Sequence, residues 1–315
     1  LSDGSPAQLR SIGAMPAVFA LPAVGIEAVC EYQSGRNSRR WSAGVVAVSL
    51  ALIGIFGARN LHQYLVTWAQ AEEPRRIYEA DIAEAARYLD SLRDNPRIVI
   101  SSDFAFDLDR YVLMATMRRR PDLKWVVGNQ SFVLPVPDGR DTLFIYTASA
   151  PLPEYICQRY LSGIEPVYQP LDPRGIPVIT VYRITPTELE RWRDLPLPDR
   201  TSAQAEIVRI TGYDIEPRQV DTALVRVYLY WQALDACPSC PEAYRFFAHL
   251  LDDPGFTWAQ ESFQGYPAWD WSAGDMALSW TDIPLTGDMP RQSYWVYAGI
   301  SRGEQMLPLT DEAGA

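Results

Sequence analysis

The sequence predicts a membrane α-helical hairpin, followed by a small α/β domain and an all-β sandwich of the jelly-roll type. Three observations predict this order: two apolar runs of helix length near the N-terminus, alternating strand and helix patterns in the middle, and short strands between turn residues in the C-terminal part. The predicted boundaries are 1–59 for the hairpin, 60–96 for an exit segment and helix, 97–186 for the α/β domain and 200–312 for the sandwich.

Composition bounds the class of protein. The chain has 315 residues, enough for about two domains. With 48% hydrophobic and 21% charged residues it does not have the composition of a disordered polymer. The net charge of −11, from 28 Lys and Arg against 39 Asp and Glu, argues against nucleic acid as a partner. The chain does not begin with Met, and 1–6 resembles the interior of a protein, so we expect a fragment of a longer chain.

The predicted hairpin rests on the runs 12–29 and 42–58, which are apolar apart from Glu27. Each is near the short end of what spans a bilayer, and their many small residues favour close packing in a larger helix bundle. The alternative is a pair of buried helices in a soluble domain. Arg36, Arg39 and Arg40 place the loop between the runs in the cytoplasm. We therefore expect a multi-pass protein of the plasma membrane, extracytoplasmic after about residue 59.

The middle of the chain alternates between helix and strand patterns. A helix pattern begins at Pro74 and ends before Asn95 and Pro96. Further helices are predicted at 108–119 and 153–161, and strands at 97–101, 124–127, 142–146 and 177–183, which is typical of a small parallel sheet. Ser101, Ser102 and Asp103 follow the first strand, at the edge where such sheets bind ligands; a turn with helix-capping residues is the favoured alternative. No dinucleotide or P-loop motif is present, and no cofactor is indicated.

The C-terminal part is rich in short strands and aromatic residues. Strands are predicted at 206–210, 223–233, 244–250, 258–260, 275–280 and 293–300. The candidate glycan contacts are Trp258, Trp269, Asp270 and Trp271, because sugar rings stack on aromatic faces and a carboxylate accepts hydroxyl hydrogen bonds. Packing inside the sandwich is the favoured alternative. His249 is interpreted as a structural residue.

The cysteines are Cys30, Cys157, Cys237 and Cys240. The Cys237–Cys240 pair has no second pair and no histidine pair nearby, so a metal site is not expected. A local disulfide is the preferred interpretation. A redox motif is the alternative, although Pro238 and Pro241 make a poor match to one.

Several stretches resemble a family of membrane enzymes. Residues 3–17 resemble the late membrane segment of bacterial GT-C type polytopic glycosyltransferases, the group of protein O-mannosyltransferases and lipid A aminoarabinose transferases. Residues 64–69 resemble the element that follows the last membrane helix of that family. Residues 247–252, 258–260, 271–275 and 297–300 resemble a β-sandwich appended to some of them. The resemblance implies sugar transfer from a polyprenyl-phosphate carrier, with the catalytic acid in an N-terminal part that this chain lacks, so no catalytic residue is carried over.

The resemblance also implies partners: the lipid bilayer, the missing N-terminal transmembrane helices, a lipid-linked sugar, and a glycan or protein acceptor. Arg10 is the candidate contact for the carrier phosphate, or it anchors the end of a helix. Ala7 stands where the family leads us to expect His, which puts that contact in doubt.

Three functions are therefore compared. The first is the non-catalytic C-terminal portion of a glycosyltransferase, with domains that recognise an acceptor or glycan. The second is a membrane-anchored sandwich module that binds carbohydrate or protein without transferase activity. The third, a self-contained hydrolase, is least favoured, because neither GxSxG nor HExxH is present and only His62 and His249 are available as histidine acid–base groups.

Overall fold

A computed structural model describes residues 24–25, 27–28, 39–68, 79–103, 108–119, 121–217, 224–237, 244–285, 287, 289–290 and 292–310. The chain divides into two compact units, Leu1–Pro74 and Arg75–Ala315.

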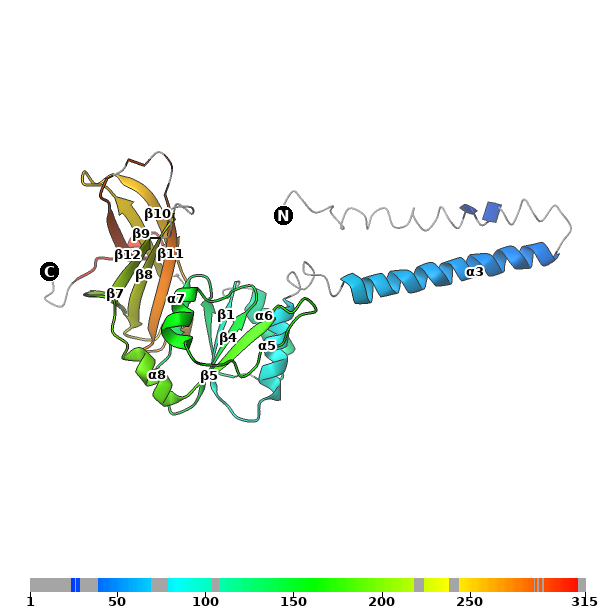
Figure 1. Ribbon diagram of the computed structural model, residues 1–315, viewed down its shortest axis with the longest axis horizontal. Helices are drawn as coiled ribbons and strands as arrows, with labels where there is room; N and C mark the ends of the chain where they lie inside the picture. The colour runs from blue at the N-terminus through cyan, green and yellow to red at the C-terminus, as the bar shows by residue number, and fades with distance from the viewer. Residues whose placement is uncertain are drawn as a thin grey trace. The chain divides into compact units, whose positions relative to one another are not determined.

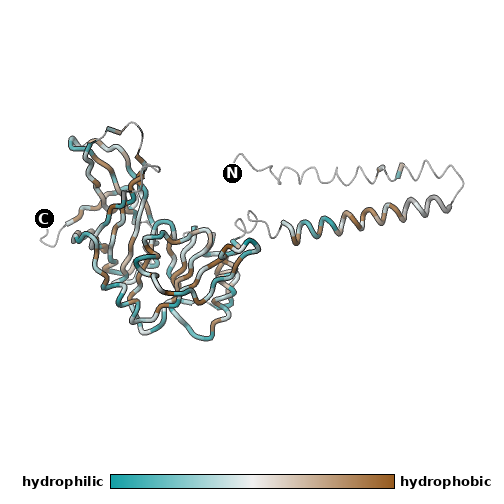
Figure 2. The backbone as a smooth tube through the Cα atoms, in the orientation of Figure 1, coloured by the Kyte–Doolittle hydropathy of each residue, from teal (hydrophilic) through white to brown (hydrophobic). Residues whose placement is uncertain are grey.

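The described part of the first unit is mainly the long helix α3 (Arg39–His62), which continues as the π-helix η1 (Gln63–Trp68) (Figure 1). The described apolar side chains of α3 are mostly exposed, among them Leu50, Ile53 and Ile55, and the apolar residues do not gather on one stripe. Figure 2 shows hydrophobic stretches along the tube of α3. In η1 the ring of Tyr64 stacks on that of Trp68, with 5.0 Å between centroids.

No helix in the described part of the chain is both long and apolar enough to cross a membrane. The apolar run of α3 is diluted by Gly and Ser, and the helix ends on Arg59, Asn60 and His62. For this part of the chain the predicted transmembrane hairpin is therefore wrong, and so is the multi-pass plasma-membrane placement with residues after 59 outside. The first predicted span, 12–29, lies almost entirely outside the described residues.

The second unit begins with a mixed sheet. Its strands are β1 (Arg97–Ser102), β2 (Leu123–Val127), β4 (Thr142–Thr147) and β5 (Ile179–Ile184), in the order β2-β1-β4-β5. Strand β1 is parallel to β2 and β4, whereas β5 runs antiparallel to β4, so the sheet is not purely parallel as predicted. Helices α5 (Ala80–Ser91) and α6 (Leu108–Thr116) contribute Ile82, Ala85, Leu89 and Leu113 to the core cluster on one face. These small and aliphatic side chains let the helices lie close to the strands.

The other face of this sheet packs on α7 (Glu154–Ile156), the π-helix η2 (Cys157–Leu161) and α8 (Pro186–Arg193). Helix α8 starts where the sequence dictates: Thr185 and Glu188 form a capping box, and Pro186 occupies the first turn. Its Trp192 contacts Phe144 of the sheet, with 5.7 Å between centroids. These helices connect the α/β sheet to the β-sandwich within one hydrophobic core.

The β-sandwich consists of two antiparallel sheets (Figure 1). The five-stranded sheet has the order β3-β11-β8-β7-β6, from Ser131–Leu134, Met276–Pro284, Leu224–Ala233, Val208–Pro217 and Asp199–Ala205. The four-stranded sheet has the order β10-β9-β12-β13, from Thr257–Phe263, Tyr244–Leu251, Trp295–Arg302 and Gln305–Met306. A 3-10 turn, η3 (Ala268–Asp270), precedes β11.

Strand β8 contacts both the α/β layer and the second sheet of the sandwich. Its alternating sequence predicts a half-buried strand, yet both of its faces are buried from Arg226 to Trp231. Tyr155 of α7 stacks on Tyr228 at 4.5 Å, and its hydroxyl lies 2.5 Å from that of Tyr230. On the opposite face Trp231 packs against Phe246 of the other sheet at 5.0 Å. The α/β layer thus covers a sheet face that would be solvated in an isolated sandwich.

Candidate functional site

The outer face of the four-stranded sheet carries a row of aromatic side chains. Along β12, Trp295 and Tyr297 are exposed at 65% and 52%, whereas Val296 and Ala298 line the space between the sheets. The strand register pairs Tyr297 with His249 and Gly299 with Phe247. Because alternate residues of a strand share one face, these side chains lie together. We define the aromatic face as Phe247, His249, Trp295 and Tyr297.

The rings of the aromatic face contact one another. Ring centroids are 4.9 Å apart for Phe247 and His249, 5.8 Å for Phe247 and Tyr297, and 6.2 Å for His249 and Tyr297. Gly299 is required beneath them, because a Cβ there would stand 2.5 Å from the Cζ of Phe247. Phe247 is buried, so Tyr297, Trp295 and the half-buried His249 form the accessible part of the face.

The exposed tryptophan ring has a fixed position. The Nε1 of Trp295 donates a hydrogen bond of 2.9 Å to Asp253 Oδ1 in the turn between β9 and β10. The preceding residue, Asp252, accepts at Oδ2 a hydrogen bond of 2.9 Å from Trp258 Nε1, and this bond lowers the pKa of the Asp252 carboxyl. A ring oriented before a ligand arrives loses little freedom when it binds one.

Neutral hydrogen-bonding groups stand beside the rings. The register places Gln260 opposite His249 and Ser262 opposite Phe247, and both side chains are exposed. Burial lowers the pKa of His249, so its imidazole is neutral at pH 7 and offers one donor and one acceptor. The surface therefore combines flat apolar rings with uncharged polar groups.

The structure does not bring Trp269, Asp270 and Trp271 together as a platform. Trp271 is 3% exposed and packs on Trp231 with 4.9 Å between centroids. Asp270 forms an ion pair of 2.6 Å with Arg110 and accepts from the backbone N–H of Trp125. Trp269 alone is exposed, at 36%. The fourth glycan-contact candidate from sequence, Trp258, bonds to Asp252, and its ring lies 6.5 Å from that of Tyr294, which precedes Trp295 in the chain.

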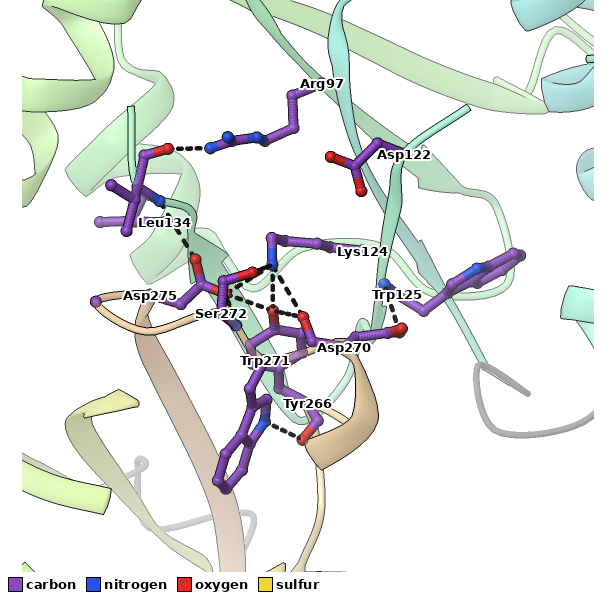
Figure 3. A network of polar contacts seen from close by, with 12 residues as sticks. Arg97, Asp122, Lys124, Trp125, Leu134, Tyr266, Asp270, Trp271, Ser272 and Asp275 are labelled. Carbon is purple, nitrogen blue, oxygen red and sulfur yellow. Dashed lines mark hydrogen bonds and ion pairs between the residues drawn. The ribbon is translucent and has the colours of Figure 1, made fainter. Parts of the chain in front are cut away.

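Lys124 is the centre of a buried polar network (Figure 3). Its Nζ donates to Asp275 Oδ2 at 2.7 Å, to Ser272 Oγ at 2.8 Å and to the Asp270 carbonyl at 2.9 Å. The hydroxyl of Tyr266 donates to the same Asp275 oxygen at 2.8 Å. Lys124 belongs to the α/β sheet and its partners to the sandwich, so the network joins the two layers. Its charges are matched internally, which indicates a structural role.

A second cluster of buried polar side chains lies beside the end of β1. Glu79 and Asp109 are 7% and 1% exposed, and the pKa of Glu79 is raised to about 8 by burial and by the charges of Asp109 and Asp81. Asp81 accepts from Ser149 Oγ at 3.1 Å, and Ser149 contacts Thr147, which donates to the Ser101 carbonyl. At pH 7 a protonated Glu79 relieves the repulsion between these carboxyl groups. No cluster of His, Cys, Asp or Glu that could hold a metal is present in the described parts of the chain.

The remaining sequence-predicted residues are placed as follows. Arg10 and Cys240 lie outside the described residues. Cys237 is disulfide-bonded. Cys157 is a free cysteine whose thiol pKa is raised by burial, so it is a weak nucleophile.

Sequence reasoning overlooked Tyr297 and interpreted His249 as structural. The signal for Tyr297 was the alternation of large and small residues along 295–299. For His249 the sequence held no such signal, because its partners come from another strand.

A comparison with models of protein families finds no match, and a comparison with curated proteins finds none either. The resemblance to polytopic glycosyltransferases therefore stays a prediction.

Proposed function

We propose that the β-sandwich binds glycans through the aromatic face. The observation that carries this proposal is the pair of exposed rings, Trp295 and Tyr297, on one strand beside the neutral polar groups of Gln260, Ser262 and His249. Residues two apart on a strand are separated by about 7 Å, so the two rings present neighbouring apolar surfaces.

The chemistry of this surface matches a sugar better than a charged ligand. A pyranose ring has an apolar C–H face, which packs on an aromatic ring, and equatorial hydroxyls, which need uncharged donors and acceptors. Among the described residues of the aromatic face, none carries a formal charge at pH 7. Arg245 stands two register pairs beyond Phe247, at the border of the face.

The wider proposal is that the chain is the non-catalytic, acceptor-recognising portion of a glycosyltransferase that uses a polyprenyl-phosphate-linked sugar. It is supported by the resemblance of residues 247–252 and 297–300, which include part of the aromatic face, to the sandwich appended to such enzymes. The expected result is that the chain alone transfers no sugar from polyprenyl-phosphate mannose. Measurable turnover in a radiolabel transfer assay would overturn this assignment.

Affinity electrophoresis of the full chain in gels that contain soluble mannan, β-glucan or galactomannan tests glycan binding. We expect at least one polysaccharide to retard the protein. Tyr297→Ala should weaken that retardation about tenfold, because a stacked ring contributes on the order of 1 kcal/mol beyond its buried area.

The matched control is Phe256→Ala. Phe256 is also an exposed aromatic residue, at 60%, but it lies in the turn before β10 and outside the aromatic face. Retardation should persist in this variant. Equal loss in both variants, or no retardation of the natural chain by any glycan, would contradict the proposal. If no glycan retards the natural chain, a protein becomes the better candidate for the ligand of the aromatic face.

A further inference from the structure

A cavity of about 790 Å³ opens between the two sheets at one end of the sandwich. This volume lies within the range of small-molecule sites, about 300–1,000 Å³. We call it the intersheet cavity. Its walls are the inward side chains of β6, β7 and β8 on one side and of β9 and β12 on the other, and the segment before β12 borders its rim.

The walls are mostly aliphatic, and their described residues are uncharged. They include Val225, Val227 and Leu229 from β8, Leu250 from β9, and Val296 and Ala298 from β12. None of the described lining residues is a Lys, Arg, His, Asp or Glu.

The charged residues of the same strands lie on the opposite face. The register pairs Glu216 with Arg226 and Ile215 with Val227, and Arg226 in turn pairs with Asp282. Arg226 and Asp282 form an ion pair of 2.6 Å on that face. An ionic group inside the intersheet cavity would therefore have no charged partner among the described lining residues and would lose its hydration.

Small side chains keep the cavity open. Face-to-face sheets stand about 10 Å apart, a gap that large interdigitating side chains normally fill. Here Ala203 and Ala298 face it from the two sheets together with valines. The strip between the sheets is therefore suited to a narrow, flexible chain more than to a rigid ring system.

Polar groups occur at the rim. Thr201 and Gln292 are exposed lining residues, and the Tyr294 hydroxyl is already used in a 2.6 Å hydrogen bond to the Pro290 carbonyl. Tyr213 and Ile215, large apolar residues of the wall, are 38% and 39% exposed. The entrance thus offers apolar surface and two neutral hydrogen-bonding side chains.

We propose that the intersheet cavity binds the aliphatic chain of a neutral amphiphile, with its polar head at Thr201 and Gln292. The site is distinct from the aromatic face, since the two use opposite faces of β12. Trp295 borders both, so its substitution would not distinguish them.

The probe is 1-decanol, titrated into the full chain and followed by thermal unfolding and by tryptophan fluorescence. We expect a saturable rise in Tm, because a ligand that binds the folded state stabilises it by mass action. We expect 1,10-decanediol to bind about tenfold more weakly, since one of its hydroxyls would be buried without a partner.

Val227→Phe should abolish the rise in Tm, because the larger ring fills the cavity. Ala298→Leu fills the opposite wall with a smaller change and serves where the first variant folds poorly. Tyr297→Ala, on the aromatic face, should keep the full response, which separates this test from that of glycan binding.

Four results would overturn the proposal: no response of the natural chain to saturating decanol, a full response in both filling variants, equal affinity for the alcohol and the diol, or a response lost in Tyr297→Ala. A concentration-dependent dimer by sedimentation that Ala298→Leu dissociates would also overturn it, and would assign the cavity to a second copy of the chain.

Discussion

The two ends of the β-sandwich are built on the same strands but filled differently. At one end Trp231, Phe246, Phe263 and Trp271 pack against one another between the sheets. At the other end the same strands β8, β9 and β12 carry Val227, Leu250 and Ala298, and a cavity of about 790 Å³ remains. Side-chain volume, with the strand pairing unchanged, decides whether a sandwich interior becomes core or binding space.

The surroundings of each end explain why one end is filled and the other is hollow. The filled end adjoins the Lys124 network, where the α/β layer is attached, and its packing orients both layers. The hollow end lies at the far ends of the same strands, near the exposed rings of Trp295 and Tyr297. If the two binding proposals hold, stability and binding lie at opposite ends of one set of strands.

The largest expected effect is at the filled end. Trp231→Ala should lower the free energy of unfolding by about 4 kcal/mol, because the deleted ring is 1% exposed and leaves a cavity among aromatic neighbours. Val227→Ala at the hollow end should cost about 1 kcal/mol or less, since its side chain borders an existing cavity. Urea unfolding measures both. Similar losses in the two variants would remove the distinction between the ends.

The second-largest loss of stability is expected from the Lys124 network, which joins the filled end to the α/β layer. Lys124→Met leaves the Asp275 carboxylate, 1% exposed, without its cationic partner. We expect a loss of about 3 kcal/mol, at the low end for a broken buried ion pair because Tyr266 still donates to Asp275. Asp275→Asn in the Lys124→Met background should recover part of the loss, as measured by chemical denaturation. Full stability of Lys124→Met would show that the network is dispensable.

Two alanines that pair across the neighbouring strands β9 and β12, Ala248 and Ala298, compare the packed interior with the cavity wall at close range. Ala248→Leu, at a position with 0% exposure that is not among the described lining residues of the cavity, should cost about 1–3 kcal/mol by overpacking the interior. Ala298→Leu should be neutral or stabilise by up to about 1 kcal/mol, because it fills part of the cavity. Thermal unfolding of the two variants and the natural chain, measured in parallel, compares their stabilities. A destabilised Ala298→Leu would mean that the hollow end has no room.

The smallest expected effect is a pH dependence from His249. Burial holds the pKa of the folded-state imidazole below its usual 6.5, so protonation favours the unfolded chain. The contribution of His249 is present above pH 6.5 and falls as the pH is lowered through 6.5 and below. His249→Gln should flatten the stability profile between pH 7 and pH 5 relative to the natural chain. Identical profiles would show that this imidazole is as solvated as in a free peptide.

Local sequence patterns indicated many of the elements. The apolar run 97–101 lies within β1, and the periodic residues of α5 face the sheet. By contrast, β3 is only four residues long, and nothing in its sequence shows that it pairs with β11. The apolar residues of 42–58 predicted a membrane span, but no helix among the described residues combines the length and the apolarity that a span needs.

The candidate site was harder to predict, because adjacency in sequence does not give direction in space. Trp269, Asp270 and Trp271 occupy a tight turn, so their side chains diverge, and Asp270 meets Arg110 from far along the chain. Trp295 and Tyr297 occupy a strand, where alternate residues share a face. His249 joins them only through strand pairing, which a single sequence does not reveal.

The pairing of β3 with β11 has a consequence for modularity. The edge strand of the five-stranded sheet is supplied by Ser131–Leu134, from within the segment that builds the α/β layer. Residues 200–312 expressed alone would expose the unpaired edge of β11 and the buried face of β8. The sandwich is thus not an independent domain. A fusion protein or a natural recombinant would have to include the α/β layer as well, because that layer supplies strand β3.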